Sequence, residues 1–344
     1  MSAVERPNSE LLSRAERLHA STIVWDQTFP ATPTCGSWMA HLTALERMRA
    51  SGYSVVSVTI ASDPDDTLTA LRRISQWRQL IRNRSDEFIL LEHARDAVSA
   101  KEQGKLAIGF HFQGTTPFDR DVGLVEVFYR LGVRHALMAY NQKNHVGDGC
   151  HERTDAGLSR FGLELVAEMQ RVGMLVDCTH TGRRTSLDVF EAATAPVIYS
   201  HSNAAALRSH QRNIDDEMAR ACAATGGVVG VNGIGIFLGD NDDSTEALFR
   251  HVDHWVQLLG AEHVGLGLDS VSEPAVLAAA VHSQASKYPA GQSYEQTELK
   301  VARPEQIPEL TERLIQAGYP DEAISAVLGG NWLRLARDVW REDA

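Results

Sequence analysis

The chain has 344 residues, of which 43% are hydrophobic, so it is long enough to bury a large core. Its formal net charge of -12 and the lack of any run dense in Lys and Arg argue against a nucleic-acid-binding surface. We expect no membrane span and no signal peptide, because no window of roughly 18 residues is uninterruptedly apolar and the N-terminal segment is charged. Four cysteines without CxxC or zinc-finger spacing predict reduced thiols in a cytoplasmic protein.

Eight short runs rich in Val, Leu and Ile have the composition of buried parallel strands. Segments with helical periodicity separate most of them, and this alternation is the sequence pattern of a parallel α/β fold. We predict a (β/α)8 TIM-type barrel; a doubly wound sheet is the weaker alternative, because no glycine-rich phosphate loop follows the first run. The runs are residues 22–26, 54–60, 105–112, 135–140, 173–178, 196–200, 226–233 and 263–268.

Two of the connecting helices are well marked. Apolar side chains recur at helical spacing in residues 158–173, and Gly173 suits the C-terminal end of that helix. Residues 213–227 form the other, with Asp215 and Asp216 in a first turn where carboxylates interact favourably with the helix dipole.

Two stretches depart from the repeat. Residues 141–160 are polar, glycine-rich and too long for a simple strand-to-helix connection, so we expect a lid or substrate loop on the active face. Residues 270–307 show little helical periodicity and are predicted to form another loop. The chain from 307 to 340 has the pattern of two or three helices, so we predict one domain over about 10–340 with a C-terminal helical extension.

Three of the predicted strands lead into side chains that carry hydrolytic chemistry. GMLVDCTH ends at His180, PVIYSH ends at His201 and HVGLGLD ends at Asp269. The C-terminal ends of parallel barrel strands meet on the active face, so we expect these three residues to share one cavity. A lone histidine is more often a hydrogen-bonded structural residue, but two on consecutive strands favour a metal site, with Asp177 as a group that orients an imidazole.

Asp269 is predicted to be a metal ligand or a general acid–base, and the alternative is a carboxylate that caps the next helix. Gly265 and Gly267, just before it, allow neighbouring backbones to approach closely. Arg212, after the sixth run, is predicted to bind a substrate carboxylate, because a guanidinium pairs with a carboxylate through two hydrogen bonds. The alternative is a surface arginine paired with a nearby aspartate.

Other polar residues at strand ends give weaker indications. Tyr140 and Asn141 end the fourth run and are assigned to the substrate-binding set, while His111 and Gln113 end the third run and could line the same mouth.

Three further residues are interpreted as unrelated to the chemistry. His251 and His254 are placed on the surface of an outer helix, which is remote from the mouth of a barrel. Cys150 has no evident base partner and is interpreted as a loop thiol rather than a nucleophile.

Several blocks of the chain, in order, resemble the membrane dipeptidase family, a branch of the amidohydrolase-type metal-dependent barrels. The resemblance runs from about residue 105 to 340 and implies a (β/α)8 barrel, two zinc ions, hydrolysis of dipeptides and in some members of β-lactams, and a homodimer. The blocks are GVRHALMAYN, GLSRFGLELVAEMQRVGMLVDCTH, APVIYSHSNA, RNIDDE, ATGGVVGVN, HVDHWVQLLGAEHVGLGLD and LGGNWLRLARDVW.

The resemblance also implies roles for individual residues. His180 and His201 match the two histidines that bind one of the family's metals, and Asp269 matches its catalytic acid–base. Arg212 matches the arginine that holds the substrate's carboxylate, and Tyr140 stands where the family has a substrate-facing histidine.

The other metal site of the family is not preserved. The family begins its first strand with Asp-Gly-His-x-Asp, whereas this chain has WDQTFP. Thr28 and Pro30 replace the two ligands if Asp26 aligns with the first Asp, and Asp26 and Thr28 replace them if Pro30 aligns with the proline after the motif. The bridging glutamate becomes Gln113, a neutral amide that bridges two cations poorly.

We therefore predict at most one tightly bound divalent ion, zinc, held by His180 and His201 with Gln113, Asp269 or water completing the shell. The leading hypothesis is a metal-dependent hydrolase of an amide or peptide-like bond in a small carboxylate-bearing substrate. Two alternatives stay open: a barrel enzyme of changed reaction type, such as a lyase or decarboxylase, and a non-catalytic protein that binds a small molecule. No nucleic-acid or membrane partner is expected.

Overall fold

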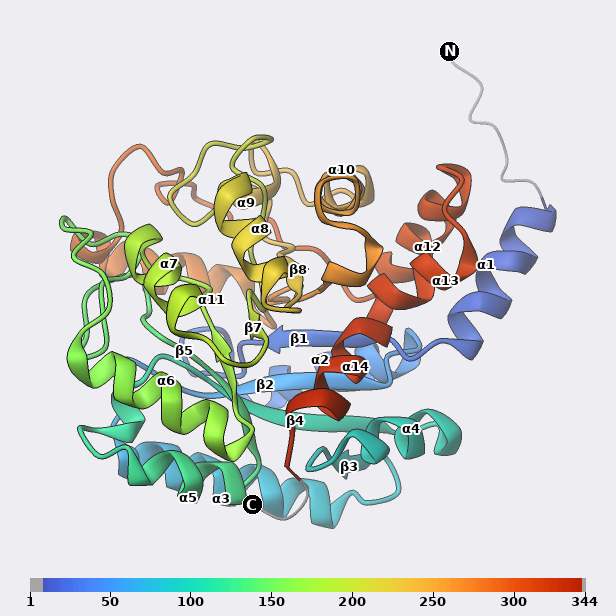
Figure 1. Ribbon diagram of the computed structural model, residues 1–344. Coiled ribbons are helices and arrows are strands. Elements are labelled where there is room, and N and C mark those ends of the chain that lie inside the picture. The colour runs from blue at the N-terminus through green and yellow to red at the C-terminus, as the bar shows by residue number, and fades with distance from the viewer. Residues whose placement is uncertain (1–8, 342–344) are drawn as a thin grey trace.

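Eight parallel strands form a closed barrel in the computed structural model, which describes residues 9–341 (Figure 1). Their order is β7-β6-β5-β4-β2-β1-β9-β8, and a parallel bridge between Tyr199 and Val229 joins the two ends. The predicted (β/α)8 barrel is confirmed, because each predicted run overlaps one barrel strand. The strands are β1 (Trp25–Phe29), β2 (Val55–Ser62), β4 (Leu106–Gln113), β5 (Val133–Leu137), β6 (Leu175–Asp177), β7 (Val197–Ile198), β8 (Val229–Val231) and β9 (Val264–Leu266).

One further strand, β3 (Phe88–Leu90), pairs with the first part of β4 and lies outside the barrel order. Three residues are too few to show the period of a strand, so the sequence did not indicate it. β5 pairs with the second part of β4, and β3 therefore does not contribute to the face where the strands end.

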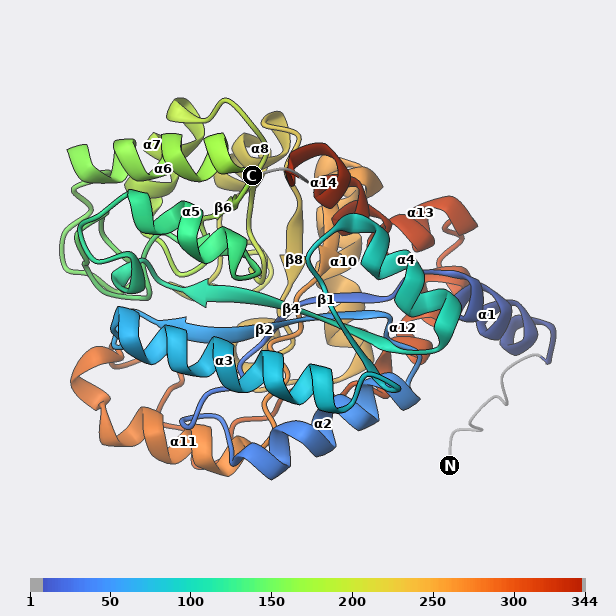
Figure 2. The same cartoon turned by 90° about the horizontal axis from the view of Figure 1, so that it is seen from below.

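Helices surround the barrel, most of them on its outside (Figures 1 and 2). They are α1 (Ser9–Ser21), α2 (Trp38–Ala50), α3 (Thr67–Asn83), α4 (Ala94–Gln103), α5 (Gly123–Arg130), α6 (Arg160–Val172), α7 (Arg183–Ala192), α8 (Asp216–Ala224), α9 (Gly235–Leu238), α10 (Thr245–Leu259), α11 (Pro274–Ser283), α12 (Gln306–Gln316), α13 (Asp321–Ser325) and α14 (Asn331–Val339). The last three confirm the predicted helices after residue 307.

Both clearly predicted helices are present: α6 ends at Gly173 as expected, whereas α8 is shorter than predicted, over 216–224 rather than 213–227. In α6 the Ser159 hydroxyl accepts a hydrogen bond from the backbone N–H of Gly162, and Gly173 ends the helix with φ 89°, a left-handed conformation that favours glycine. In α8 the Asp215 carboxylate accepts from the N–H of Met218. Local capping therefore determines where these helices begin and end.

The prediction of a loop over 270–307 was wrong in its first part. Helix α11 begins at Pro274, a residue well suited to the first helical turn, and runs to Ser283. Its sequence, PAVLAAAVHS, is apolar on most sides and so lacks the amphipathic periodicity that marks a surface helix. The polar stretch over 141–159 does form the predicted long loop, without helix or strand.

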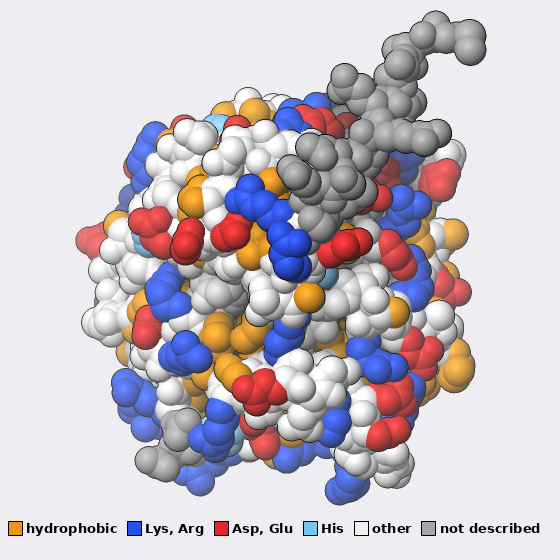
Figure 3. Space-filling view, turned by 90° about the vertical axis from the view of Figure 1, so that its right-hand side faces the viewer, with side chains coloured by type: hydrophobic (Ala, Val, Ile, Leu, Met, Phe, Trp, Pro, Cys, Tyr) orange, Lys and Arg blue, Asp and Glu red, His pale blue; other side chains and the backbone are white. Residues whose placement is uncertain are grey.

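The face that carries α1 and the C-terminal helices has interspersed charges. Lys and Arg side chains alternate there with Asp and Glu (Figure 3). Ion pairs connect the helices on this side, Arg14 with Asp321 and Arg313 with Glu246. Within the described chain, none of the helices combines the length and the apolar character that crossing a bilayer requires.

Candidate active site

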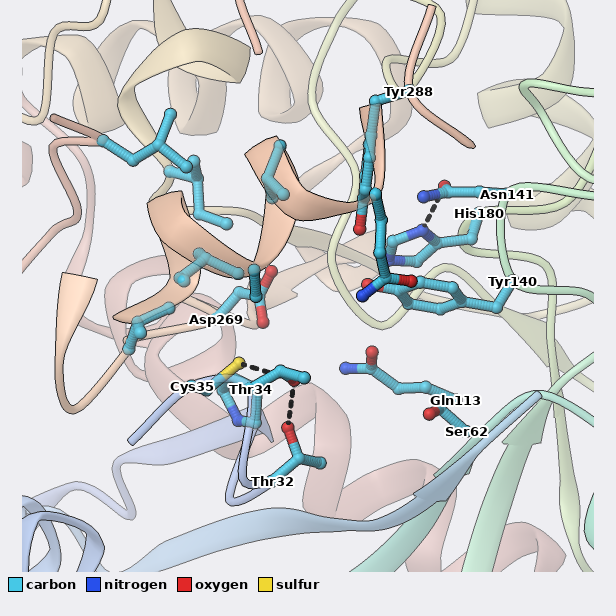
Figure 4. A pocket seen from close by; sticks show the side chains of 18 of the residues that line it. Thr32, Thr34, Cys35, Ser62, Gln113, Tyr140, Asn141, His180, Asp269 and Tyr288 are labelled. Carbon is cyan, nitrogen blue, oxygen red and sulfur yellow. Dashed lines mark hydrogen bonds between the residues drawn. The ribbon is translucent and has the colours of Figure 1, made fainter. Parts of the chain in front are cut away.

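A cavity of about 270 Å³ lies at the C-terminal ends of the barrel strands (Figure 4). Every barrel strand except β7 contributes a side chain at its end or in the segment that follows at once, and β7 contributes through its longer connection to α8. The polar lining residues are Thr32, Thr34, Cys35, Ser62, Asp65, Arg73, Gln113, Tyr140, Asn141, His180, Arg212, Asp269, Gln284, Tyr288 and Tyr294. Of the residues predicted at the mouth, His111 and His201 do not line it, so the expectation that His201 shares the cavity with His180 and Asp269 is not met.

The backbone is strained at three positions of this cavity. Six non-glycine residues of the described chain have a left-handed φ, and three of them are Asn141 (62°), His180 (64°) and Asp269 (55°). Such conformations are uncommon outside glycine and concentrate at functional sites. Each of these residues follows the end of a barrel strand, where the turn aims its side chain at the mouth.

His180 has a defined tautomer. Its Nδ1 donates to Oδ1 of Asn141 at 2.6 Å, so its Nε2 has a free electron pair. The ring of Tyr140 stacks on the imidazole with centroids 4.2 Å apart and an interplanar angle of 25°. Burial and the nearby Arg212 hold the pKa of His180 well below its usual range, so the imidazole is neutral.

His201 is fully buried directly behind His180. The two Nε2 atoms are 3.2 Å apart, and Nδ1 of His201 contacts the hydroxyls of Thr28 at 3.0 Å and Ser200 at 2.7 Å. In the structure as it stands, His201 Nε2–H donates to His180. Because a hydroxyl can donate or accept, the other tautomer of His201, with Nδ1–H and a free Nε2, is equally well satisfied.

This pair fits a single cation. Two imidazole nitrogens on one tetrahedral zinc stand about 3.3 Å apart, since each Zn–N bond is about 2.0–2.1 Å. However, residues 9–341 contain no group of three or more His, Cys, Asp or Glu side chains arranged to hold an ion. An ion held by this pair would therefore complete its shell with water or another group.

Asp269 and Arg212 carry the opposite charges of the cavity. One carboxylate oxygen of Asp269 accepts from Nδ2 of Asn232 at 3.2 Å, and burial raises its pKa to about 6 although Arg212 opposes the shift. Arg212 is 3% exposed, its Nη2 makes only a long bond of 3.4 Å to the carbonyl of His201, and its Nε has no partner. No carboxylate of the described chain pairs with this buried guanidinium, so it is poised for an external anion. The alternative of an Arg212 paired at the surface with a nearby aspartate is wrong.

The close approach of β9 to β7 depends on glycine. A Cβ on Gly267 would lie 1.9 Å from the carbonyl oxygen of Ser200 and 3.1 Å from Cβ of His201. The predicted role of the Gly-x-Gly pattern before Asp269 is thus confirmed at this position.

Gln113 keeps an unpaired donor near the cavity, because its Nε2 is buried without a hydrogen-bond partner. The next residue, Gly114, has φ 141° and packs against Asp63, whose Oδ1 would lie 2.3 Å from an added Cβ. Asp63 accepts from the N–H groups of Thr115 at 2.9 Å and Tyr140 at 2.8 Å. It thereby joins the ends of β2, β4 and β5, a role that the sequence did not indicate.

The altered first strand faces the site through Thr28 and Pro30. Thr28 contacts His201 and Pro30 lines the cavity, whereas Asp26 lies beneath them and is fully buried. Oδ1 of Asp26 accepts from the N–H groups of Thr28 at 3.1 Å and Leu268 at 2.9 Å, and its Oδ2 has no partner. Thr28 and Pro30 therefore lie at the site, and Asp26 does not.

We predict that Asp26 makes the protein less stable as the pH rises. Burial raises the pKa of Asp26 from 3.8 to about 7, so the native state binds more protons than the unfolded state between these values. Stability should fall from about pH 4 to about pH 7, by an amount on the order of a few kcal/mol. Thermal melts of wild type and Asp26→Asn over this range test it, since the variant should lose most of this slope. Parallel slopes for the two proteins would contradict the assignment.

A polar cluster fills the barrel interior below the mouth. His111 does not line the cavity as predicted: it is fully buried and stacks on His135 with centroids 4.4 Å apart. Ser57 Oγ contacts Nδ1 of His111 at 3.0 Å and Nε2 of His135 at 3.3 Å. Asp177 contacts Nδ1 of His135 at 3.1 Å, so the imidazole that it orients belongs to His135 and not to His180 or His201.

The interpretation of His251 as a surface residue was wrong. It is fully buried, accepts from the N–H of Ala204 at 3.1 Å and donates to the carbonyl of Leu238 at 3.0 Å. His254, on the same helix, is partly exposed and pairs with Asp216. A single sequence shows that α10 is a helix but not how deeply each face is buried.

Cys150 lies in the loop over 141–159 and donates through Sγ to Oδ1 of Asn141 at 3.4 Å. Burial raises its pKa to about 11, so the thiol is protonated, which suits the prediction of a loop thiol. This loop borders a second cavity of about 290 Å³, and His180 and Arg212 lie between the two cavities.

The sequence reasoning missed two groups of lining residues. Tyr288 and Tyr294 lie in the segment after α11, and Tyr288 stands beside Tyr140 and His180 in Figure 4. Ile236 and Phe237 come from α9. Aromatic residues within a polar, glycine-containing stretch were the signal available for the first group, and α9 left no signal because it has four residues.

Comparisons with known proteins agree with this geometry. The family described as "Membrane dipeptidase (Peptidase family M19)" matches residues 22–290. An uncharacterised dipeptidase of Schizosaccharomyces pombe is 34% identical over 207 residues, which are 58% of this chain and 50% of that protein, so the match spans half of the yeast protein's length.

Two solved structures resemble the whole barrel. The crystal structure of an amidohydrolase from Pseudomonas aeruginosa is 32% identical, with a TM-score of 0.84 over 95% of this chain and 99% of that one. A metallopeptidase from Rhodobacter sphaeroides, bound to a phosphinate mimic of the dipeptide L-Ala-D-Ala, has a TM-score of 0.76 at 21% identity, covering 93% of this chain and 100% of its own. The second likeness concerns the fold alone.

Proposed function

The chain belongs to the membrane dipeptidase family, and from this premise we propose that it is a metal-dependent hydrolase of an amide or peptide-like bond in a small carboxylate-bearing substrate. The observation that carries the proposal is the pair of Nε2 atoms of His180 and His201, 3.2 Å apart, beside an unpaired Arg212. Together they offer a cation site and an anion site at one end of the barrel.

One divalent ion, for which zinc is our proposal, would be held by His180 and His201, with Gln113, Asp269 or water completing the shell. Such an ion, when bound, supplies Lewis acidity toward the scissile carbonyl and toward water. Arg212 binds the substrate's carboxylate. Asp269 accepts a proton from the attacking water and passes it to the leaving nitrogen, a transfer suited to a group with a pKa of about 6.

Tyr140 is proposed to contact the substrate, whereas Asn141, which was predicted to bind substrate, is proposed to orient His180 instead. Burial holds the pKa of Tyr140 well above its usual value, so its hydroxyl stays protonated and can donate to the substrate. Asn141 acts through His180, whose Nδ1 it engages, and thereby presents Nε2 of that imidazole toward the cation site.

The test of the function is hydrolysis of a panel of dipeptides and N-acyl amino acids by protein supplied with zinc, manganese or cobalt. We expect turnover that depends on added metal and is lost with a chelator. Decarboxylation or elimination products would favour a changed reaction type. A protein that binds carboxylates but turns over none of the panel would favour a non-catalytic role.

Arg212 is predicted to set the affinity for the substrate's carboxylate. Arg212→Lys retains the charge but loses the two-pronged hydrogen bond, and Arg212→Ala loses both. We expect kcat/KM to fall by roughly 10- to 100-fold in the alanine variant, mainly through KM, and by less in the lysine variant. Arg220→Lys, on the exposed side of α8, is the matched control. Unchanged turnover in Arg212→Ala would remove the carboxylate-binding role.

Three further proposals concern the protein as a whole. We propose a single barrel domain over 10–340, a homodimer and a cytoplasmic location. The homodimer follows from the family resemblance, and the location is supported by Cys35, Cys150, Cys178 and Cys222, all of which are unpaired. Light scattering at micromolar concentration that gave the mass of one chain would exclude the dimer.

A further inference from the structure

Only some of the charged side chains that line the cavity are free to interact with a substrate. Asp65 and Arg73 are engaged with each other through two bonds, of 2.9 and 3.0 Å. Among the described residues that line the cavity, Arg212 and Asp269 are therefore the two charged side chains without an ion-pair partner. A substrate thus meets one free cation, and one carboxylate that the proposed reaction requires for proton transfer.

The wall next to Asp269 is apolar. Side chains from the β8–α10 connection and from the segment after β9 form a hydrophobic cluster that is separate from the barrel core. The members that line the cavity include Ile234, Ile236, Phe237, Leu277, Val281 and Leu299. The guanidinium of Arg212 lies close to the ring of Phe237, with Cζ 5.2 Å from the ring centroid. The proposed anion site therefore borders this apolar wall.

A dipeptide would bring a charge that this wall does not match. Its α-carboxylate pairs with Arg212, but its α-ammonium lies on the other side of the scissile bond. The carboxylate of Asp65 is already paired with Arg73, and the other lining groups that could approach the ammonium, apart from Asp269, are uncharged hydroxyls and amides such as Ser62 and Gln113. Transfer of an ionised ammonium out of water without a free counter-charge is costly, whereas an apolar acyl group avoids this cost and gains free energy where it packs on the apolar wall next to Asp269.

We propose that the acyl half of the substrate is uncharged and apolar, so that the preferred substrates are N-acylated amino acids rather than dipeptides with a free α-amino group. This inference rests on the proposed hydrolase function and names its substrate class. In the reaction the oxygen of water bonds to the acyl carbon and the C–N bond breaks. The water proton passes through Asp269 to the nitrogen, and the products are an apolar carboxylic acid and an amino acid.

A matched pair of compounds tests the proposal. Leucyl-leucine and N-(4-methylpentanoyl)-leucine differ only in the α-ammonium group, and both configurations of the C-terminal leucine are assayed. For protein supplied with zinc we expect kcat/KM to be at least ~10-fold higher for the acyl compound. The Asp269→Asn variant should bind both compounds without hydrolysing them. Calorimetry with this variant therefore measures the two binding affinities separately from the reaction.

The outcomes separate this inference from the function on which it rests. Tighter binding of the acyl compound without turnover of either would support the recognition and contradict the hydrolase. Equal or better turnover of the dipeptide would overturn the inference and leave the hydrolase intact. If neither compound binds or reacts, both are overturned.

A pair of variants on α11 provides a second test. Leu277 lines the cavity, and Leu277→Glu adds a carboxylate to the apolar wall, so the ratio of kcat/KM values should shift toward the dipeptide by roughly fivefold or more. Val276 is 37% exposed and lies outside the cavity, so Val276→Glu adds the same charge on the same helix and should leave the ratio unchanged. Equal ratios in wild type, Leu277→Glu and Val276→Glu would count against the apolar wall as the determinant.

Discussion

Replacing His201 with alanine is expected to abolish both tight metal binding and hydrolysis. His180 alone cannot chelate an ion, and apart from Asp269 the other polar groups beside it in the cavity are weak or neutral ligands. We expect a loss of at least ~1000-fold in kcat, because no group of the described chain replaces the lost Lewis acid. His254→Ala, on the outer helix α10, is the matched control and should retain metal and activity.

Elemental analysis of wild-type protein purified without chelators accompanies this variant. The neutral Gln113 and the Thr28/Pro30 pair leave too little negative charge for two adjacent cations, so about one equivalent of metal per chain is expected. Two equivalents of zinc would show that the first strand supplies ligands after all. No metal, with no activation by zinc, manganese or cobalt, would favour the metal-free alternatives.

Asp269→Asn is expected to lower kcat by roughly 100- to 10,000-fold while the fold stays intact, because an amide of the same shape cannot shuttle the proton. It should also remove the acidic limb of the pH profile. In the wild type, burial raises the pKa of Asp269 to about 6, so the basic carboxylate form is lost and activity falls as the pH drops below that value.

The control for this variant is Asp240→Asn, an exposed carboxylate in the connection between α9 and α10. It should leave kcat and the pH profile unchanged. If Asp269→Asn retained more than about a tenth of the wild-type kcat, proton transfer would have to be assigned to another group.

The sequence by itself determined the barrel, and it predicted which strand ends carry His180, His201 and Asp269. These features are local: a buried parallel strand is an apolar run, and the residue that follows it lies on the face where the strands converge. The cap at Gly173 was predicted for the same reason, because a helix end is determined by neighbouring residues.

Only the tertiary structure decided which side chains meet. His111 precedes Gln113 by two residues at the same strand end, yet it is buried in the barrel interior against His135. Whether a polar side chain reaches the mouth or the interior depends on the depth and register of its strand, and a shift of one residue exchanges the two faces. Asp177 likewise engages His135 across β5 and β6, a pairing that no spacing in the chain indicates.

The apolar wall next to Asp269 could not be predicted from the sequence for a related reason. Phe237 and Leu277 belong to segments 40 residues apart, and they become neighbours only when the segment after β9 folds over the end of β8. An apolar helix such as α11 could be buried at many places in a protein. Its composition therefore indicates that it is buried but does not indicate which residues it packs against. The contacts across the closed barrel place that helix at the active face, and with it the apolar surface that the substrate meets.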